Sequence, residues 1–211
     1  MRRRDPRAAL DLYRQVAGAY DLATAWLEPY RHRAISKLGL QPGDVVLDVG
    51  CGTGMSFAPI EAAIGPRGRL VGIEQSPEMM AHARERVRAA GWANATLIEA
   101  RAEEAAIPVQ ADAALFAFTH DVLRSPEGLA NVLGKVRSGG RVAAAGPKWT
   151  LLAPPLNPLV WQVARRFVTT FEGFWRPWTE LERLVPGLSV EEAVLGCVYV
   201  VWGLRQHPRF A

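Results

Sequence analysis

The sequence predicts an α/β fold with a mainly parallel β-sheet. Apolar runs rich in β-branched residues alternate with longer segments of helical spacing, the pattern of strand–helix–strand crossover units. A glycine-rich turn with Gly50, Gly52 and Gly54 directly follows the first apolar run. Glycine lets the backbone approach a ligand more closely than any Cβ allows. The fold class therefore comes with a predicted ligand site at the end of the first strand.

Five strands of the parallel part can be placed along the chain. We expect them near Val45–Val49, Leu70–Glu74, Thr96–Glu99, Ala113–Phe118 and Arg141–Ala145. Two later runs, Ser189–Leu195 and Cys197–Leu204, flank Gly196, which suits a hairpin. They are expected to be the antiparallel pair that closes a seven-stranded sheet.

Helices are expected between these strands and ahead of the first one. Two N-terminal helices are predicted, over residues 6–18 and from Tyr20 to Leu38, where Gly39 ends the second. The helix Pro77–Ala90 has Ser76 as N-cap and Gly91 after its end. A further helix is expected over Leu129–Val136.

Three more segments have distinct predicted roles. Residues 137–142, with two adjacent glycines, predict a turn into the fifth strand. Residues 148–184 contain four of the seven tryptophans and, over 159–170, helical spacing with Arg165 and Arg166 on one side. This segment is expected to be an insertion that caps an apolar acceptor pocket, with the two arginines available to an acidic or phosphate-bearing acceptor, although ordinary packing of the rings is the alternative.

Composition predicts one domain over residues 1–211. The chain has 49% hydrophobic residues, enough for a sizeable core at this length. No apolar run is long enough to span a membrane, and the arginine-rich start lacks an apolar signal core, so we expect a cytoplasmic protein. Two cysteines and four scattered histidines give no disulfide framework and no metal site.

The net charge of +4 is a weak indication of partners. It mildly favours an acidic partner or peripheral contact with an anionic membrane, although a solvated arginine-rich surface explains it equally well. The arginines are scattered and do not form a basic run with interleaved aromatics. A nucleic-acid partner is therefore not expected.

Two carboxylates give the ligand site its chemistry. Asp48 precedes the glycine turn, and Glu74 ends the second apolar run. A dinucleotide-binding turn would need its third glycine where Met55 stands, and Asp48 would serve a pyrophosphate poorly. A nicotinamide-dependent reductase is accordingly disfavoured. Glu74 is placed to accept from ribose hydroxyls, and Asp48 suits a cationic amino-acid group, as in S-adenosylmethionine (SAM).

With these motifs the chain resembles class I SAM-dependent methyltransferases, in the group of ubiquinone, menaquinone, phospholipid and small-molecule methyltransferases. The resemblance implies a Rossmann-like fold, SAM as cofactor, S-adenosylhomocysteine (SAH) as product, and residues 1–40 as an N-terminal lid. The cofactor-binding residues that it implies are Tyr20, Asp48, Gly50, Cys51, Gly52, Gly54, Glu74, Gln75, Met79, Arg101, Ala102, Glu103, Phe118 and Thr119. Arg101 departs from the group, which usually has an aspartate there as adenine acceptor. The Ala102 backbone or Glu103 is expected to serve instead.

The end of the fourth strand faces the transferred methyl group in this resemblance, so His120 is the candidate catalytic base. The alternative is that His120 only lines the cofactor site. The expected acceptor is a small or amphipathic molecule, with an amine or lipid head group slightly ahead of C- or O-methylation of a quinone or secondary metabolite. A SAM-binding protein without transferase activity is the alternative of another class. The sequence predicts no oligomeric state.

Overall fold

The computed structural model describes residue 21 and residues 24–165 and 168–206. It contains a seven-stranded sheet in the order β3-β2-β1-β4-β5-β7-β6. The strands are β1 (Val45–Val49), β2 (Arg69–Glu74), β3 (Ala95–Glu99), β4 (Ala111–Ala117), β5 (Val136–Pro147), β6 (Ser189–Ala193) and β7 (Val198–Leu204). Only β7 runs antiparallel to its neighbours, β5 and β6. The predicted fold class and the closing hairpin are confirmed.

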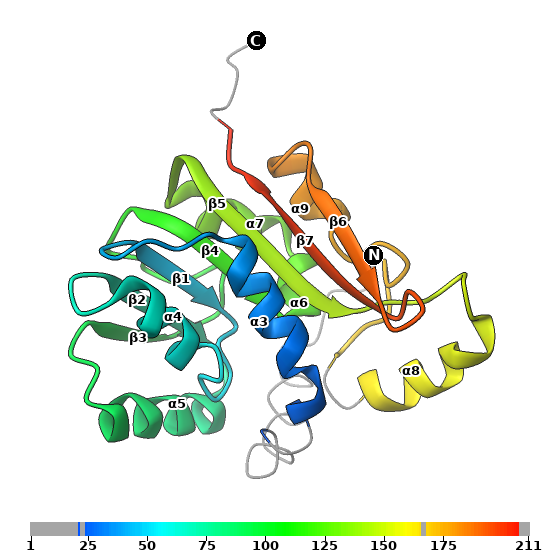
Figure 1. Cartoon of the computed structure of the whole chain (residues 1–211), viewed down its shortest axis with the longest axis horizontal. Helices are drawn as coiled ribbons and strands as arrows, with labels where there is room; N and C mark the ends of the chain where they lie inside the picture. Colours follow the sequence, from blue (N-terminus) through cyan, green and yellow to red (C-terminus); the bar gives the residue numbers. More distant parts are fainter. Residues whose placement is uncertain (1–20, 22–23, 166–167, 207–211) are drawn as a thin grey trace.

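Helices cover both faces of the sheet (Figure 1). One face packs against α3 (Glu28–Lys37), α4 (Phe57–Ile64) and α5 (Pro77–Ala90). The other packs against α6 (His120–Leu123), α7 (Pro126–Gly134) and α9 (Thr179–Leu184). The central strands are buried on both faces, which explains why they appear in the sequence as continuous apolar runs.

Helix ends follow the local sequence signals. Ser76 accepts a hydrogen bond from the backbone N–H of Met79 and so caps α5, and Gly91 ends it in a left-handed conformation. This prediction is confirmed residue by residue. In the described part of the predicted helix from Tyr20, Asp21 and Thr24 are helical, and the 3₁₀ turn η2 (Ala25–Leu27) comes before α3. Pro29, which lacks a backbone N–H, lies in the first turn of α3.

The predicted turn before the fifth strand was wrong. Residues 137–140 are part of β5, and the preceding helix ends at Gly134. Ala111 pairs with Val136 before a register shift, and the backbone N–H of Gly139 donates to the carbonyl of Arg205. The neighbouring strands therefore extend β5 through a segment whose local sequence favours a turn.

The insertion between β5 and β6 holds η3 (Pro154–Leu156) and α8 (Asn157–Ala164). This helix begins earlier than the helical spacing predicts, because Asn157 exchanges two hydrogen bonds with the backbone of Thr150. It also ends earlier, at Ala164. Figure 1 shows α8 and the β6–β7 turn at the end of the molecule away from β2 and β3.

Candidate active site

The glycine turn after β1 adopts the backbone that its sequence predicts. Gly50, Gly52 and Gly54 all have positive φ. A Cβ on Gly50 would lie 2.5 Å from the Thr119 side chain, and one on Gly54 would lie 2.6 Å from the Phe57 ring. Only glycine fits at these two positions, because both the backbone angle and the neighbours exclude a side chain.

Glu74 connects the turn to the start of α5. Its carboxylate accepts from the backbone N–H of Gly52 at 3.1 Å and of Ser76 at 2.7 Å. Burial raises the pKa of Glu74, and these backbone hydrogen bonds oppose that rise. A carboxylate has about four lone-pair sites, so these bonds and a further one from the Gln75 backbone leave room to accept from a ribose hydroxyl.

Asp48 lies at the end of β1, with 1% of its surface exposed. Burial raises its pKa to about 7, although the Arg31 charge and a hydrogen bond with Ser56 oppose the shift. Its Oδ2 atom is buried and has no hydrogen-bond partner among the described residues. A buried carboxylate oxygen without a donor is costly, and a cationic amino group supplies that donor.

Arg31 brings a cation to the same place from α3. It is 4% exposed, donates to Glu28 at 2.8 Å and to Ser56 at 3.3 Å, and lies over the Phe118 ring at 5.2 Å from its centroid. A guanidinium has five N–H donors, so these bonds leave donors for a further acceptor. The site thus offers an anion and a cation side by side, which suits a zwitterionic amino-acid group.

The N-terminal segment is bonded to the glycine turn. Asp21 accepts from the Thr53 hydroxyl at 2.5 Å and pairs with Arg86 of α5. Arg86 also donates to the Thr53 carbonyl. These contacts hold residue 21 against the turn between β1 and α4.

The segment after β4 forms a wall between this site and a second cavity. Phe118 has φ of +62°, a strained conformation for a bulky residue. Thr119 lies against Gly50, and its buried hydroxyl has no hydrogen-bond partner among the described residues. His120, almost fully buried, donates from Nε2 to the carbonyl of Glu172 at 3.2 Å and packs edge-on against Phe174.

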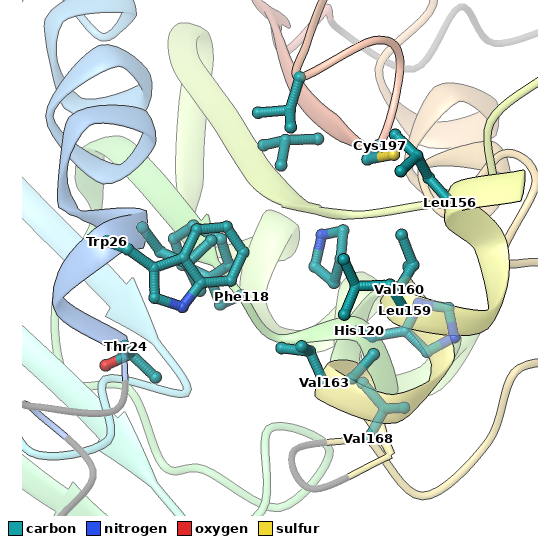
Figure 2. A pocket seen from close by; sticks show the side chains of 15 residues that line it. Thr24, Trp26, Phe118, His120, Leu156, Leu159, Val160, Val163, Val168 and Cys197 are labelled. Carbon is teal, nitrogen blue, oxygen red and sulfur yellow. The ribbon is translucent and has the colours of Figure 1, made fainter. Parts of the chain in front are cut away.

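The second cavity has a volume of about 260 Å³ and an almost entirely apolar lining. Figure 2 shows Trp26 and Phe118 on one side, and Leu159, Val163 and Val168 on the other. Thr24, Trp26 and His120 are the hydrogen-bonding side chains in the described lining, apart from the Cys197 thiol. No described lining residue is a carboxylate, a lysine or an arginine.

A family model described as a methyltransferase domain matches residues 46–140, which hold the glycine turn, both carboxylates and His120. Residues 46–140 thus correspond to a methyltransferase domain, and the chain is similar to class I SAM-dependent methyltransferases. SAM is therefore the cofactor of this domain, and the site fits it: the orphaned Asp48 oxygen, the Glu74 carboxylate and the glycine cradle match its amino group, ribose and backbone contacts.

Two curated relatives and one solved structure show which known proteins the chain is similar to. Aklanonic acid methyltransferase DauC of a Streptomyces species is 27% identical over 88% of each chain. Demethylmenaquinone methyltransferase of Bacillus cytotoxicus is 30% identical over 44% of this chain and 42% of its own length. A SAM-dependent methyltransferase from Aquifex aeolicus has a TM-score of 0.58 at 20% identity, covering 83% of this chain and 89% of its own.

Coverage varies among the curated relatives. The chain spans 42% of the Bacillus enzyme and 36% of a 37.1 kDa transposon protein from Streptomyces fradiae that is 30% identical over 58% of this chain. The solved structure supports the fold alone, because its sequence is only 20% identical to this chain.

The structure brings together several of the residues predicted to bind the methyltransferase cofactor. Glu74 contacts Gly52, and Gly50 contacts Thr119. Cys51 is buried beside Gly72, and burial raises the pKa of its thiol well above the usual range. Tyr20 lies outside the described residues.

The remaining predicted residues lie along β2, β3 and α5. Gln75 is half-buried after β2, and Met79 is fully buried in α5. Ala102 is buried after β3, where its carbonyl accepts from Asn131. Arg101 pairs with Glu103 at 2.7 Å, so part of the Glu103 carboxylate proposed as an adenine acceptor is already engaged.

The insertion lines the cavity with aliphatic side chains and not with its tryptophans. The half-buried Trp149 stacks on Phe171, and the buried Trp178 packs on Tyr199, so these rings pack within the protein as the alternative foresaw. None of the four tryptophans of the insertion is in the described cavity lining; its contribution is aliphatic, from α8 and its flanks. Arg165 lies over the Trp161 ring and does not line the cavity.

Sequence reasoning missed Arg31 and Trp26. One signal was available for Arg31, because it shares a helix stripe with the buried residues Ala34, Ile35 and Leu38. A charged residue on an apolar stripe indicates either a buried partner or a ligand. Trp26, in the 3₁₀ turn, has no comparable sequence signal.

Proposed function

We propose that this methyltransferase transfers the SAM methyl group to an oxygen or acidic carbon of an apolar or amphipathic small molecule. The observation that carries the proposal is the apolar cavity, separated from the cofactor residues by Phe118 and Thr119 and containing His120. The relatives that act on demethylmenaquinone and aklanonic acid support an acceptor of this kind.

When bound, SAM supplies a methyl group activated by its sulfonium. Asp48 would accept from its amino group, Arg31 would donate to its carboxylate, and Glu74 would accept from its ribose. Phe118 and the aliphatic wall would exclude water and hold the acceptor in line, which lowers the barrier through proximity.

His120 would remove the proton that the acceptor loses. A carbonyl oxygen only accepts, so the contact with Glu172 assigns the ring proton to Nε2 and leaves the lone pair of the neutral ring on Nδ1. The acceptor atom would take the methyl group as SAM becomes SAH, and the acceptor proton would pass to the imidazole of His120. The transfer of one methyl group and one proton balances both atoms and charge, and it needs no metal ion.

An amine or phospholipid head group, preferred on the sequence alone, remains a prediction with less support. The described lining offers no carboxylate for an ammonium and no cation for a phosphate. A lipid-like tail, by contrast, suits the aliphatic wall. The cavity thus favours a neutral acceptor with an ionisable hydroxyl or carbon over a charged head group.

Methyl-labelled SAM and a panel of acceptors test the proposal. The panel comprises a hydroxynaphthoquinone, a phenolic polyketide, phosphatidylethanolamine and a soluble primary amine, with products identified by mass spectrometry. We expect label in the first two. His120→Asn should lower kcat by about 10² to 10⁴ with SAH affinity unchanged. Label confined to the amines, or full turnover by His120→Asn, would contradict the assigned chemistry, and SAH binding without any turnover would favour a non-catalytic SAM-binding protein.

A further inference from the structure

Six large apolar side chains are exposed together beside the cavity. They come from the loop before α8, from α8 itself and from the β6–β7 turn, and we call them the apolar rim: Leu151, Leu152, Leu159, Trp161, Val194 and Leu195. Leu151 is 78% exposed, Leu152 74% and Leu195 63%. Clustered exposed apolar side chains mark an interaction surface, whereas isolated ones do not.

The rim is a built structure, because its two loops are bonded to each other. The Thr150 hydroxyl, fully buried, donates to the carbonyl of Leu195 and accepts from the N–H of Leu152. The Cβ position of Gly196 lies 3.5 Å from Leu152. Asn157 bonds to Thr150 on both its backbone groups. The leucines are therefore held outward on a fixed support.

The β6–β7 turn displays apolar side chains where polar ones are usual. Val194 and Leu195 both have left-handed backbone, with φ of 51° and 53°. Asparagine, aspartate and glycine normally occupy such positions, and a β-branched residue there is strained. The turn therefore has a strained backbone and exposes two apolar side chains to water at its tip. A hairpin with polar residues or glycine at these positions would avoid both costs.

Charge distinguishes the kind of partner. Residues 149–164 and 193–204 contain no charged side chain. The first charge after α8 is Arg165, exposed, with its guanidinium 4.9 Å from the Trp161 ring centroid. The exposed leucines suit the hydrocarbon of a lipid surface, and the neighbouring Trp161–Arg165 pair suits its anionic head groups. A bilayer also needs no hydrogen-bonding partners from the rim.

The rim is continuous with the acceptor cavity, since Leu159 and Val194 belong to both. An apolar acceptor dissolved in a membrane would therefore reach His120 along apolar surface. No helix in the described ranges is long and apolar enough to cross a bilayer, so the contact would be peripheral. We propose that the apolar rim inserts into the head-group region of an anionic bilayer, from which the acceptor enters the cavity. The inference rests on the proposed function for its last clause only.

Co-sedimentation of the full chain with vesicles tests this directly. We expect binding to phosphatidylcholine vesicles that contain phosphatidylglycerol, and weaker binding to phosphatidylcholine alone or at high salt. The double variant Leu151→Glu/Leu152→Glu and, separately, Leu195→Glu should each reduce vesicle binding about ten-fold or more. Leu204→Glu is the matched control: this residue is 57% exposed at the opposite end of β7, and its replacement should leave binding unchanged.

SAH titration on every variant separates the possible failures. Variants that keep SAH affinity are folded, so a vesicle result on them reports on the rim. Absence of wild-type binding to anionic vesicles, or equal loss in Leu204→Glu, overturns the inference and leaves the methyltransferase proposal intact. Concentration-dependent dimerisation that the rim variants abolish, without vesicle binding, would assign the rim to a second copy and also overturn it. Loss of SAH binding by the wild-type chain would instead refute the proposed function.

Discussion

Asp48 shows how burial can be offset by a ligand. Its pKa, raised from 3.8 to about 7, means that the folded protein favours the protonated carboxyl. In the ligand-free protein, stability contributed by this group is therefore present below pH 3.8 and is lost as the pH rises towards 7. A bound ammonium favours the carboxylate and reverses this preference.

We expect SAM affinity to rise from about pH 5 to about pH 7 and then level off, because binding releases the Asp48 proton. Asp48→Asn should bind SAM about ten-fold or more weakly at neutral pH and lose most of this pH dependence. Calorimetry in buffers of different ionisation enthalpy measures the released proton directly. A wild-type affinity that is flat over this range would contradict the assignment.

Arg31 is the second residue whose role depends on burial. Arg31→Met should weaken SAH binding by about 10- to 100-fold, the value of a charge-assisted hydrogen bond to a carboxylate. Binding of 5′-methylthioadenosine, which lacks the amino-acid group, should change little. Arg33→Met is the matched control on the same helix, since Arg33 is exposed and pairs with Glu191. Equal losses for both nucleosides would assign Arg31 a structural role.

At the scale of elements, the glycine turn and the segment after β4 act as one unit. Their contact is the close approach of Thr119 to Gly50. Neither segment specifies this contact alone, because the β1–β4 pairing sets the distance between them. The turn thus depends on sheet register as much as on its own glycines.

Gly50→Ala should destabilise the fold by about 2 kcal/mol or more and weaken SAH binding, through both backbone strain and the clash with Thr119. Gly91→Ala supplies the comparison, because Gly91 is left-handed with φ of 70° and has nothing within 4 Å of its Cβ position. That variant should cost about 1 kcal/mol and leave SAH affinity unchanged. Denaturant unfolding and calorimetry measure both effects. Equal effects of the two substitutions would show that the contact with Thr119 is unimportant.

At the scale of the whole molecule, the cofactor site joins parts that are distant in the chain. Asp21, Arg31, Asp48, Glu74 and Thr119 come from the N-terminal segment, α3, two strands and the end of a third. A ligand that contacts all of them stabilises the folded state relative to the unfolded chain, in which the site does not exist.

SAH at about a hundred times its dissociation constant should stabilise the protein by about 2.7 kcal/mol. For a domain of this size, the midpoint of thermal unfolding should rise by roughly 5 to 10 °C. Scanning calorimetry checks the shift, with adenosine at the same concentration as a weaker ligand. A midpoint unchanged by SAH would contradict the site as assigned.

Local signals in the sequence were enough to predict the sheet, the hairpin, the α5 caps and the positions of both carboxylates. These features depend on local periodicity, on capping residues and on glycines at a strand end, all of which act over a few residues. The prediction failed at residues 137–140, where pairing with neighbouring strands overrode a local turn preference.

Which side chains meet depends on the three-dimensional packing. It placed Arg31 beside Asp48, gave the cavity an aliphatic wall in place of the expected tryptophans, and brought Leu152 against the β6–β7 turn. The physical reason is that burial and charge proximity arise from contacts between residues far apart in the chain. A sequence pattern shows which face a residue occupies, whereas packing decides what lies opposite that face.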